Sequence, residues 1–197
     1  MMGPREPASL DQDRALVESV LARVPGAFEA LVRAYQGLCW RIIHRMVRDP
    51  EDARELCQET FLRVHRHLNQ YRFESSFRSW LGQVAYSVAV RYLKRKRLQI
   101  VAPADADAHD EILARVRDGF DFESAYADGE LVAHVRNAIE ELSPMQRTLL
   151  AMYHFEEMSI GEIALVMQTP EGTVKSHLFR ARAALRVRLQ AILEKRG

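Results

Sequence analysis

Residues suited to DNA recognition gather near the start of a predicted helix that follows Gly172. Cations, a hydroxyl, an imidazole and an aromatic ring lie on its outward positions: Lys175, Ser176, His177, Phe179, Arg180 and Arg182. Near a helix N-terminus such side chains can reach base edges in a major groove, while arginines hold phosphates. A generic three-helix bundle with a solvated basic face is the alternative, and Phe179 alone fits a core position equally well.

The residues that precede this helix have the pattern of a helix-turn-helix. Ser159 and Glu162 have the spacing of a capping box, which predicts the start of a short helix there. A turn over residues 168–172, containing Pro170 and Gly172, follows before the longer second helix begins. A short capped helix, a tight turn and a longer helix form the usual order of this motif.

A second group of candidate nucleic-acid contacts lies in residues 71–97. The segment 71–77 holds three aromatic rings and an arginine, and the helix predicted after it is polar at every fourth position and ends in a basic run. Rings can stack on unpaired bases while cations hold the phosphates. The candidate site residues are Arg72, Phe73, Ser75, Ser76, Gln83, Ser87, Arg91, Lys94 and Arg95. Alternatively Phe77 and Trp80 are core residues, an interpretation we favour for Trp80, and the basic run only favours a helix C-terminus.

An acidic stretch on a third predicted helix is a poor candidate for catalysis. Asp52, Glu55 and Glu59 lie there beside Gln58, with no histidine or metal-ligand spacing nearby. His65 and His67 are two residues apart, which places them on different helix faces. We therefore expect no enzyme activity, metal or cofactor, and interpret the stretch as a protein-docking face.

The two cysteines, Cys39 and Cys57, lack metal-binding or redox-motif spacing. Buried structural thiols in a reducing compartment are the favoured interpretation, and a disulfide or redox switch is the alternative. The N-terminus has no apolar run and no segment is long and apolar enough to cross a bilayer, so we expect a cytoplasmic protein without membrane insertion.

The net charge of +1 over 197 residues is an average over unlike segments. Residues 1–99 carry 17 basic and 11 acidic side chains, residues 100–141 carry 3 and 11, and residues 142–197 carry 8 and 5. The charge distribution therefore indicates two basic modules joined by an acidic linker. This pattern is compatible with nucleic-acid binding although the net charge of the whole chain is nearly zero.

The spacing of apolar residues predicts an all-α fold of two small helical domains joined by a flexible linker. Apolar side chains recur at three and four residues, and alternating β-branched runs are absent. Helices are expected over 11–24, 27–48, 50–68 and 77–97, and then over 131–142, from 144, over 160–167 and after 172. The domains are expected at 1–97 and 131–197, with the linker at 98–130.

Several long motifs, in order, resemble those of bacterial sigma factors. Residues 28–35, 52–64 and 73–81 are similar to sigma region 2, and residues 142–144, 160–164 and 172–182 are similar to sigma region 4. The size, and a linker in place of region 3, resemble the extracytoplasmic-function group. The match extends over nearly the whole chain outside residues 98–130.

The resemblance implies a subunit that binds the RNA polymerase core at its clamp and flap and directs it to promoter DNA. Core docking would involve Asp52, Glu55, Gln58, Glu59 and Phe61. The loop and helix of residues 71–97 would recognise and melt the minus-ten element. Thr173 would join the outward residues of the last helix in recognising the minus-thirty-five element. Members of this family commonly bind an anti-sigma factor, and the residues leave open whether this chain has one.

Two positions depart from the pattern of the family. Ser87 and Arg91 stand where asparagine and then aspartate are common, which puts the usual minus-ten preference in question and adds a cation near the DNA strand. A self-sufficient helix-turn-helix regulator that binds operator DNA without polymerase is the alternative function. It would need a dimer and a palindromic site, and it gives the loop at 71–77 no purpose.

Overall fold

The computed structural model describes the backbone of residues 7–99 and 129–194 and the side chains of residues 13–96 and 135–191. Within these ranges the regular structure is entirely helical. The expected all-α class is thereby confirmed. The acidic linker expected at 98–130 lies almost wholly outside the described residues.

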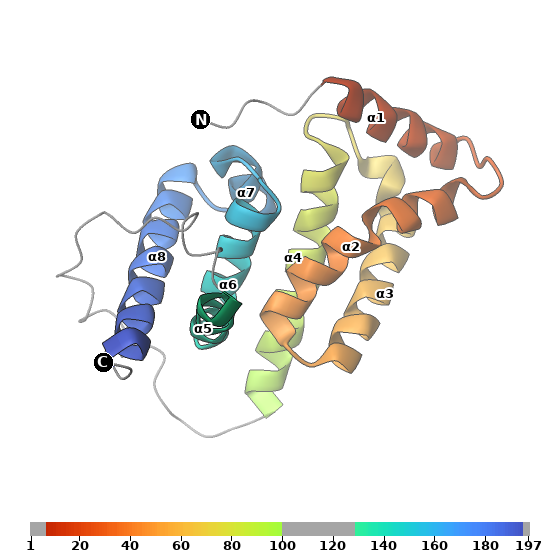
Figure 1. The fold of residues 1–197 in the computed structure, drawn as a ribbon. Helices are drawn as coiled ribbons and strands as arrows, with labels where there is room; N and C mark the ends of the chain where they lie inside the picture. Colours follow the sequence, from red (N-terminus) through yellow and green to blue (C-terminus); the bar gives the residue numbers. More distant parts are fainter. Residues whose placement is uncertain (1–6, 100–128, 195–197) are drawn as a thin grey trace.

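The N-terminal domain consists of four α-helices around one apolar core (Figure 1). They are α1 (Pro7–Leu21), α2 (Ala27–Val47), α3 (Pro50–His67) and α4 (Phe77–Gln99), with a short 3₁₀ turn at Leu68–Gln70. The side chain of Asp49 caps α3 by accepting hydrogen bonds from two backbone N–H groups, as the residue pattern predicts. Leu31, Ile43 and Leu81 are fully buried in this core.

Two expectations for this domain need correction. The first helix ends at Leu21 rather than at Val24, because Arg23 adopts a left-handed backbone with a φ of 57° that an α-helix cannot continue. Trp80 is half-buried rather than buried, because it lies at the edge of an aromatic cluster beside Tyr71 and Phe77.

The C-terminal domain begins with α5 (Gly129–Glu140) and α6 (Pro144–Leu150), which continues into a π-helical turn at Ala151–Phe155. The helix-turn-helix follows as α7 (Ile160–Met167) and α8 (Glu171–Glu194). Both predicted capping boxes, at Ser143 and Ser159, form with their two reciprocal hydrogen bonds. The π-helical geometry at Ala151–Phe155 was not predicted. Helix α8 begins at Glu171, inside the segment 168–172 that was expected to form the turn of the helix-turn-helix.

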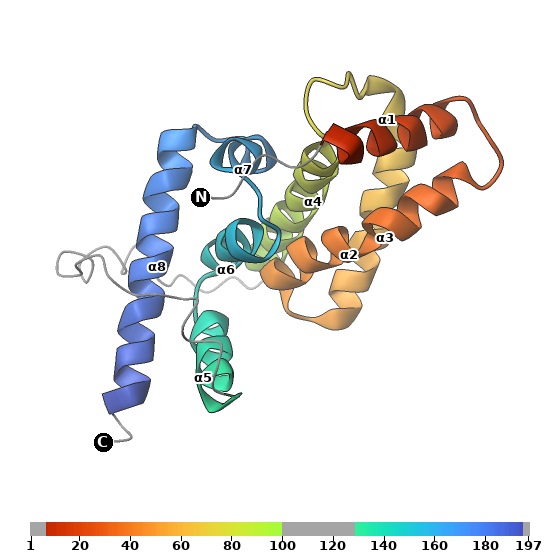
Figure 2. The same ribbon diagram turned by 45° about the horizontal axis from the view of Figure 1, so that its top comes forward.

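The two domains pack against each other in a closed arrangement. Helix α7 lies along α4, and α6 lies against α2 (Figure 2). The approach of α7 to α4 is close, since a Cβ atom added to Gly82 would lie 3.0 Å from Cγ2 of Val166. Two domains were predicted from the sequence, but this interface was not.

The cap of α7 provides a test of the local fold. We expect Ser159→Ala to lower the free energy of unfolding by about 1 kcal/mol, because the first turn of α7 loses its side-chain acceptor. Thermal unfolding followed by circular dichroism measures the change. Ser176→Ala removes an exposed hydroxyl that bonds only to a carbonyl of its own helix, and it serves as the control. Equal melting temperatures for Ser159→Ala and the wild type would contradict this role of the cap.

Candidate functional site

The first turns of α8 present a basic and aromatic surface. Lys175, Ser176 and Arg180 are exposed, and Phe179 is 51% exposed. Thr173, His177 and Arg182 are half-buried beside them, whereas Val174 and Leu178 turn inward to the core. None of the seven residues predicted for this helix is buried, and Phe179 lies outside the core.

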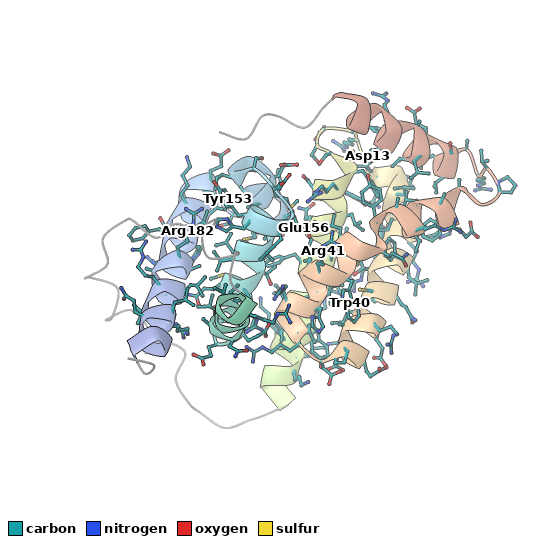
Figure 3. The ribbon with its side chains drawn as sticks, in the orientation of Figure 1. Asp13, Trp40, Arg41, Tyr153, Glu156 and Arg182 are labelled. Atoms are coloured by element: carbon teal, nitrogen blue, oxygen red, sulfur yellow. The ribbon has the colours of Figure 1, made fainter. Side chains whose placement is uncertain are left out.

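Contacts from the preceding π-helical turn position one end of this surface. The guanidinium of Arg182 lies 4.9 Å from the ring centre of Tyr153 and 3.4 Å from Nε2 of His154 (Figure 3). Burial, together with the charge of Arg182, lowers the pKa of His154. A hollow of about 290 Å³ lies between Tyr153 and the α8 residues Lys175, Phe179 and Arg182.

The loop at residues 71–77 is built around a cluster of aromatic rings. The ring centres of Tyr71 and Phe73 are 4.7 Å apart, and the guanidinium of Arg14 lies 4.9 Å from the centre of the Phe73 ring. Phe73 has a φ of 59°, in the left-handed region that costs free energy for a bulky residue. The loop thus holds Phe73 half-buried in an unusual backbone conformation.

The other predicted residues of this segment divide into three groups. Arg72, Arg91, Lys94 and Arg95 are exposed, and Gln83 and Ser87 are half-buried on α4. Ser75 and Ser76 have structural bonds, since the Ser75 carbonyl accepts from the Tyr71 hydroxyl and the Ser76 hydroxyl receives the backbone N–H of Ser79. Gln83, Ser87, Arg91 and Lys94 line a crevice of about 470 Å³. Its far side is formed by Val166, Met167 and Gln168 of the other domain.

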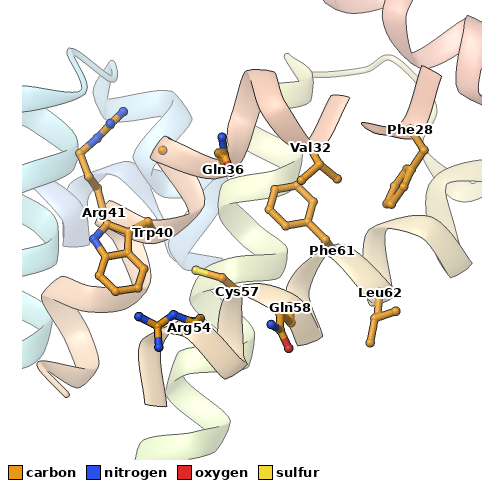
Figure 4. A pocket seen from close by; sticks show the side chains of 11 residues that line it. Phe28, Val32, Gln36, Trp40, Arg41, Arg54, Cys57, Gln58, Phe61 and Leu62 are labelled. Atoms are coloured by element: carbon orange, nitrogen blue, oxygen red, sulfur yellow. The ribbon is translucent and has the colours of Figure 1, made fainter. Parts of the chain in front are cut away.

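An apolar groove with a volume of about 760 Å³ lies between α2 and α3 (Figure 4). Its apolar lining comes from Phe28, Val32, Trp40, Phe61 and Leu62. We call it the α2–α3 groove. Leu62 is 57% exposed within it and adds to its apolar surface.

The five residues predicted to dock on the polymerase core divide around this groove. Gln58 and Phe61 line it, whereas Asp52, Glu55 and Glu59 are not among its lining residues. The carboxylate of Asp52 accepts hydrogen bonds from Tyr92 and Lys96 of α4, and the bond from Tyr92 lowers its pKa. Glu59 pairs with Arg63 at 2.6 Å, and Glu55 is exposed.

The sequence of this chain matches a known protein family and known relatives. Residues 31–99 match sigma-70 region 2, and residues 134–185 match sigma-70 region 4. The RNA polymerase sigma-H factor of Pseudomonas aeruginosa is 36% identical over 187 residues, which cover 93% of this chain and 96% of the relative. The chain belongs to the sigma-70 family. An ECF RNA polymerase sigma-E factor of Haemophilus influenzae is 31% identical over 92% of this chain and 97% of its own length, which places this sigma factor in the extracytoplasmic-function group.

Solved structures share the fold of this sigma factor at low sequence identity. CnrH, solved with the cytosolic domain of CnrY, has a TM-score of 0.62 at 21% identity and covers 91% of this chain and 97% of CnrH. The sigma factor RpoE of Bartonella quintana, solved with the anti-sigma factor NepR, also has a TM-score of 0.62, at 16% identity, and covers 84% of this chain and 98% of its own.

Val32, Trp40 and Leu62 of the α2–α3 groove were not among the residues predicted from the sequence, whereas Phe61 was. Val32 and Trp40 lie on α2 outside the stripe that fills the core, and Leu62 lies next to the buried Phe61. A second apolar face on an amphipathic helix is the signal that could have identified them.

Two further findings concern metals and membranes. No group of three or more His, Cys, Asp or Glu side chains that could hold a metal occurs among residues 13–96 and 135–191. No helix in the part of the chain that the structure describes is long and apolar enough to cross a membrane.

Proposed function

We propose that this sigma factor docks on the RNA polymerase core through the α2–α3 groove and the exposed part of α3 beside it. The groove supplies apolar area through Trp40 and Leu62, and Gln58 supplies a polar contact at its rim. The face of α3 that carries Glu55 and Glu59 would meet cations of the polymerase clamp. A protein partner would cover the exposed apolar side chains of this groove.

Recognition and melting of the minus-ten element are assigned to the loop at residues 71–77 and the outer face of α4. Phe73 can offer its ring to an unstacked base, and the exposed cations Arg72, Arg91, Lys94 and Arg95 can hold the phosphates of the separated strand. Gln83 and Ser87 supply polar groups between them. Ser75 and Ser76 are assigned to the shape of the loop, because the Ser75 carbonyl and the Ser76 hydroxyl bond to Tyr71 and Ser79.

Recognition of the minus-thirty-five element is assigned to the first turns of α8. The observation that carries this assignment is the exposed row of Lys175, Ser176, Phe179 and Arg180 beside the N-terminus of a recognition helix. Thr173 and His177 flank this row, and Arg182 is held in place by Tyr153. This is the part of a helix-turn-helix that reaches base edges in a major groove.

The proposal comprises binding and strand separation without covalent chemistry, at the polymerase in the cytoplasm. We place the domain boundaries at 1–97 and 131–197, with the acidic linker at 98–130 between them. Promoter elements about two DNA turns apart, on the order of 70 Å, require that linker to be extended. Because solved relatives of the same fold include complexes with partner proteins, one of them an anti-sigma factor, an anti-sigma factor is a further expected partner.

A DNA-binding experiment with and without polymerase tests this proposal. We expect the free protein to show no sequence-specific protection of promoter duplex in a footprint, and strong specific protection once core polymerase is added. Tight, sequence-specific binding by the free protein as a dimer would instead support a self-sufficient helix-turn-helix regulator. The family match does not favour that second function.

Arg180 provides a test of the upstream contact. We expect Arg180→Ala to weaken recognition of the minus-thirty-five element by about 1–3 kcal/mol, because a bidentate contact to a base is lost. The measurement compares binding of the polymerase holoenzyme to promoters with intact and scrambled upstream elements. Glu171→Gln, at an exposed position one turn before Lys175, is the control. An unchanged preference for the intact element in Arg180→Ala would remove Arg180 from the set that reads DNA.

A further inference from the structure

Glu156 is the most unusual charged residue of the described chain, because its carboxylate is buried in the contact between the two domains. Its side chain is 4% exposed and lies beside Arg41 of α2 and Arg78 of α4 (Figure 3). Arg41 approaches it with two nitrogens, and one of them donates to Oε2 at 2.9 Å. Arg78 donates to the same oxygen at 3.1 Å and also to the backbone carbonyl of Glu156.

A second contact across the same interface supports the fit. Arg147 of α6 is 3% exposed, and its Nε donates at 2.9 Å to the backbone carbonyl of Arg45 in the last turn of α2. Burial lowers the pKa of Arg147 to about 10. Carbonyls at the end of a helix lack partners within the helix, so this guanidinium satisfies one that would otherwise need water. Two buried charged side chains of the C-terminal domain, Glu156 and Arg147, each hydrogen-bond to the N-terminal domain, which shows a specific contact between the domains.

The closed arrangement places α7 beside a surface that the proposed function requires. The α4 residues Gln83, Ser87, Arg91 and Lys94 share a crevice with Val166, Met167 and Gln168 at the end of α7. With α7 along α4, one domain stands in the path of DNA toward this face, and the two recognition surfaces cannot lie on promoter elements about 70 Å apart.

We propose that Glu156 is a latch that holds the free sigma factor in a closed, self-inhibited state and that must release Arg41 and Arg78 before promoter DNA can be melted. Arg41 also lines the α2–α3 groove, so a polymerase segment that enters the groove competes for the same guanidinium. Docking and opening are thereby coupled through one side chain. This coupling rests on the proposed function, whereas the latch itself is a property of the free chain.

The first test measures the shape of the free, full-length chain. Glu156→Gln keeps the size of the side chain and removes its charge, so the arginines lose their ionic partner. We expect small-angle X-ray scattering to show a larger radius of gyration for this variant. Glu157→Gln is the matched control, because the neighbouring Glu157 is exposed. A folded Glu156→Gln variant, by circular dichroism, with the radius of gyration of the wild type would overturn the latch.

The second test closes the interface covalently. In the double variant Gly82→Cys with Val166→Cys, the two thiols are added where a Cβ atom on α4 would lie 3.0 Å from the Val166 side chain of α7. A peroxide oxidises the two thiols to a disulfide, with loss of two protons and two electrons to the peroxide, which is reduced to water. We expect the oxidised protein to lose at least about 10-fold in open-complex formation with core polymerase, and to recover it with dithiothreitol. Full activity of the oxidised, cross-linked protein would overturn the proposal.

The two tests separate failure of the latch from failure of the proposed function. If Glu156→Gln expands while neither it nor the wild type supports open complexes with any core polymerase preparation, the latch stands and the proposed function fails. If the wild type forms open complexes while Glu156→Gln remains compact and the cross-linked protein remains active, the proposed function stands and the latch fails.

Discussion

Leu62→Asp is expected to weaken binding of this sigma factor to RNA polymerase core by at least about 10-fold. Leu62 is 57% exposed at the rim of the α2–α3 groove, so the substitution places a charge on an apolar docking surface. The buried core of an interface contributes most of its binding free energy, and desolvating an unpaired carboxylate there costs several kcal/mol. Because the side chain is already exposed in the free protein, the fold is expected to tolerate the change.

Fluorescence anisotropy of labelled sigma factor titrated with core polymerase measures this affinity. Val24→Asp is the matched control, because Val24 is 50% exposed in the connection between α1 and α2 and does not line the groove. We expect the control to bind as the wild type does. If Leu62→Asp keeps wild-type affinity while its circular dichroism is unchanged, the groove is not the docking surface.

Phe73→Ala is expected to lower formation of open promoter complexes by about 10-fold or more. Stacking of an unpaired base on an aromatic ring contributes about 1–3 kcal/mol, and this contribution exists only once the strands have separated. Closed-complex binding should change little, because duplex DNA offers no flipped base to the ring. Permanganate footprinting of unpaired thymines, beside a filter-binding measurement of closed complexes, distinguishes the two steps.

The conservative variant Phe73→Tyr retains a ring that can stack, and we expect it to melt the promoter nearly as well as the wild type. Phe73→Ala also loses the contact with Arg14, which Phe73→Tyr keeps, so circular dichroism is needed to show that the loop and its domain remain folded. Equal losses in closed and open complexes for Phe73→Ala would assign the ring to binding rather than to melting.

Local features of the fold were predictable from residue type and spacing. Asp49, Ser143 and Ser159 cap their helices as expected, because capping depends on residues within three positions along the chain. The outward row of α8 was also predictable, since a periodicity of 3.6 residues separates Lys175 and Arg180 from the buried Val174 and Leu178.

Features that depend on residues far apart in the chain were not predictable. Nothing local distinguishes Glu156 from the exposed Glu157, because the burial of Glu156 is set by Arg41 and Arg78, 115 and 78 positions away. The α2–α3 groove likewise requires α2 and α3 to be placed side by side before Trp40 and Leu62 can be recognised as one surface. The acidic residues Asp52, Glu55 and Glu59 were predicted to dock from their charge and from the resemblance to sigma region 2, and charge gave no signal for the apolar groove.

Transcription with purified core polymerase tests the central claim most directly. The measurement maps RNA 5′ ends produced from a genomic DNA library by core polymerase alone and by core polymerase with this sigma factor. We predict new start sites that share two upstream sequence elements and appear only when the sigma factor is present. Start sites identical with and without the protein, from a preparation that is folded and binds core polymerase, would contradict the account.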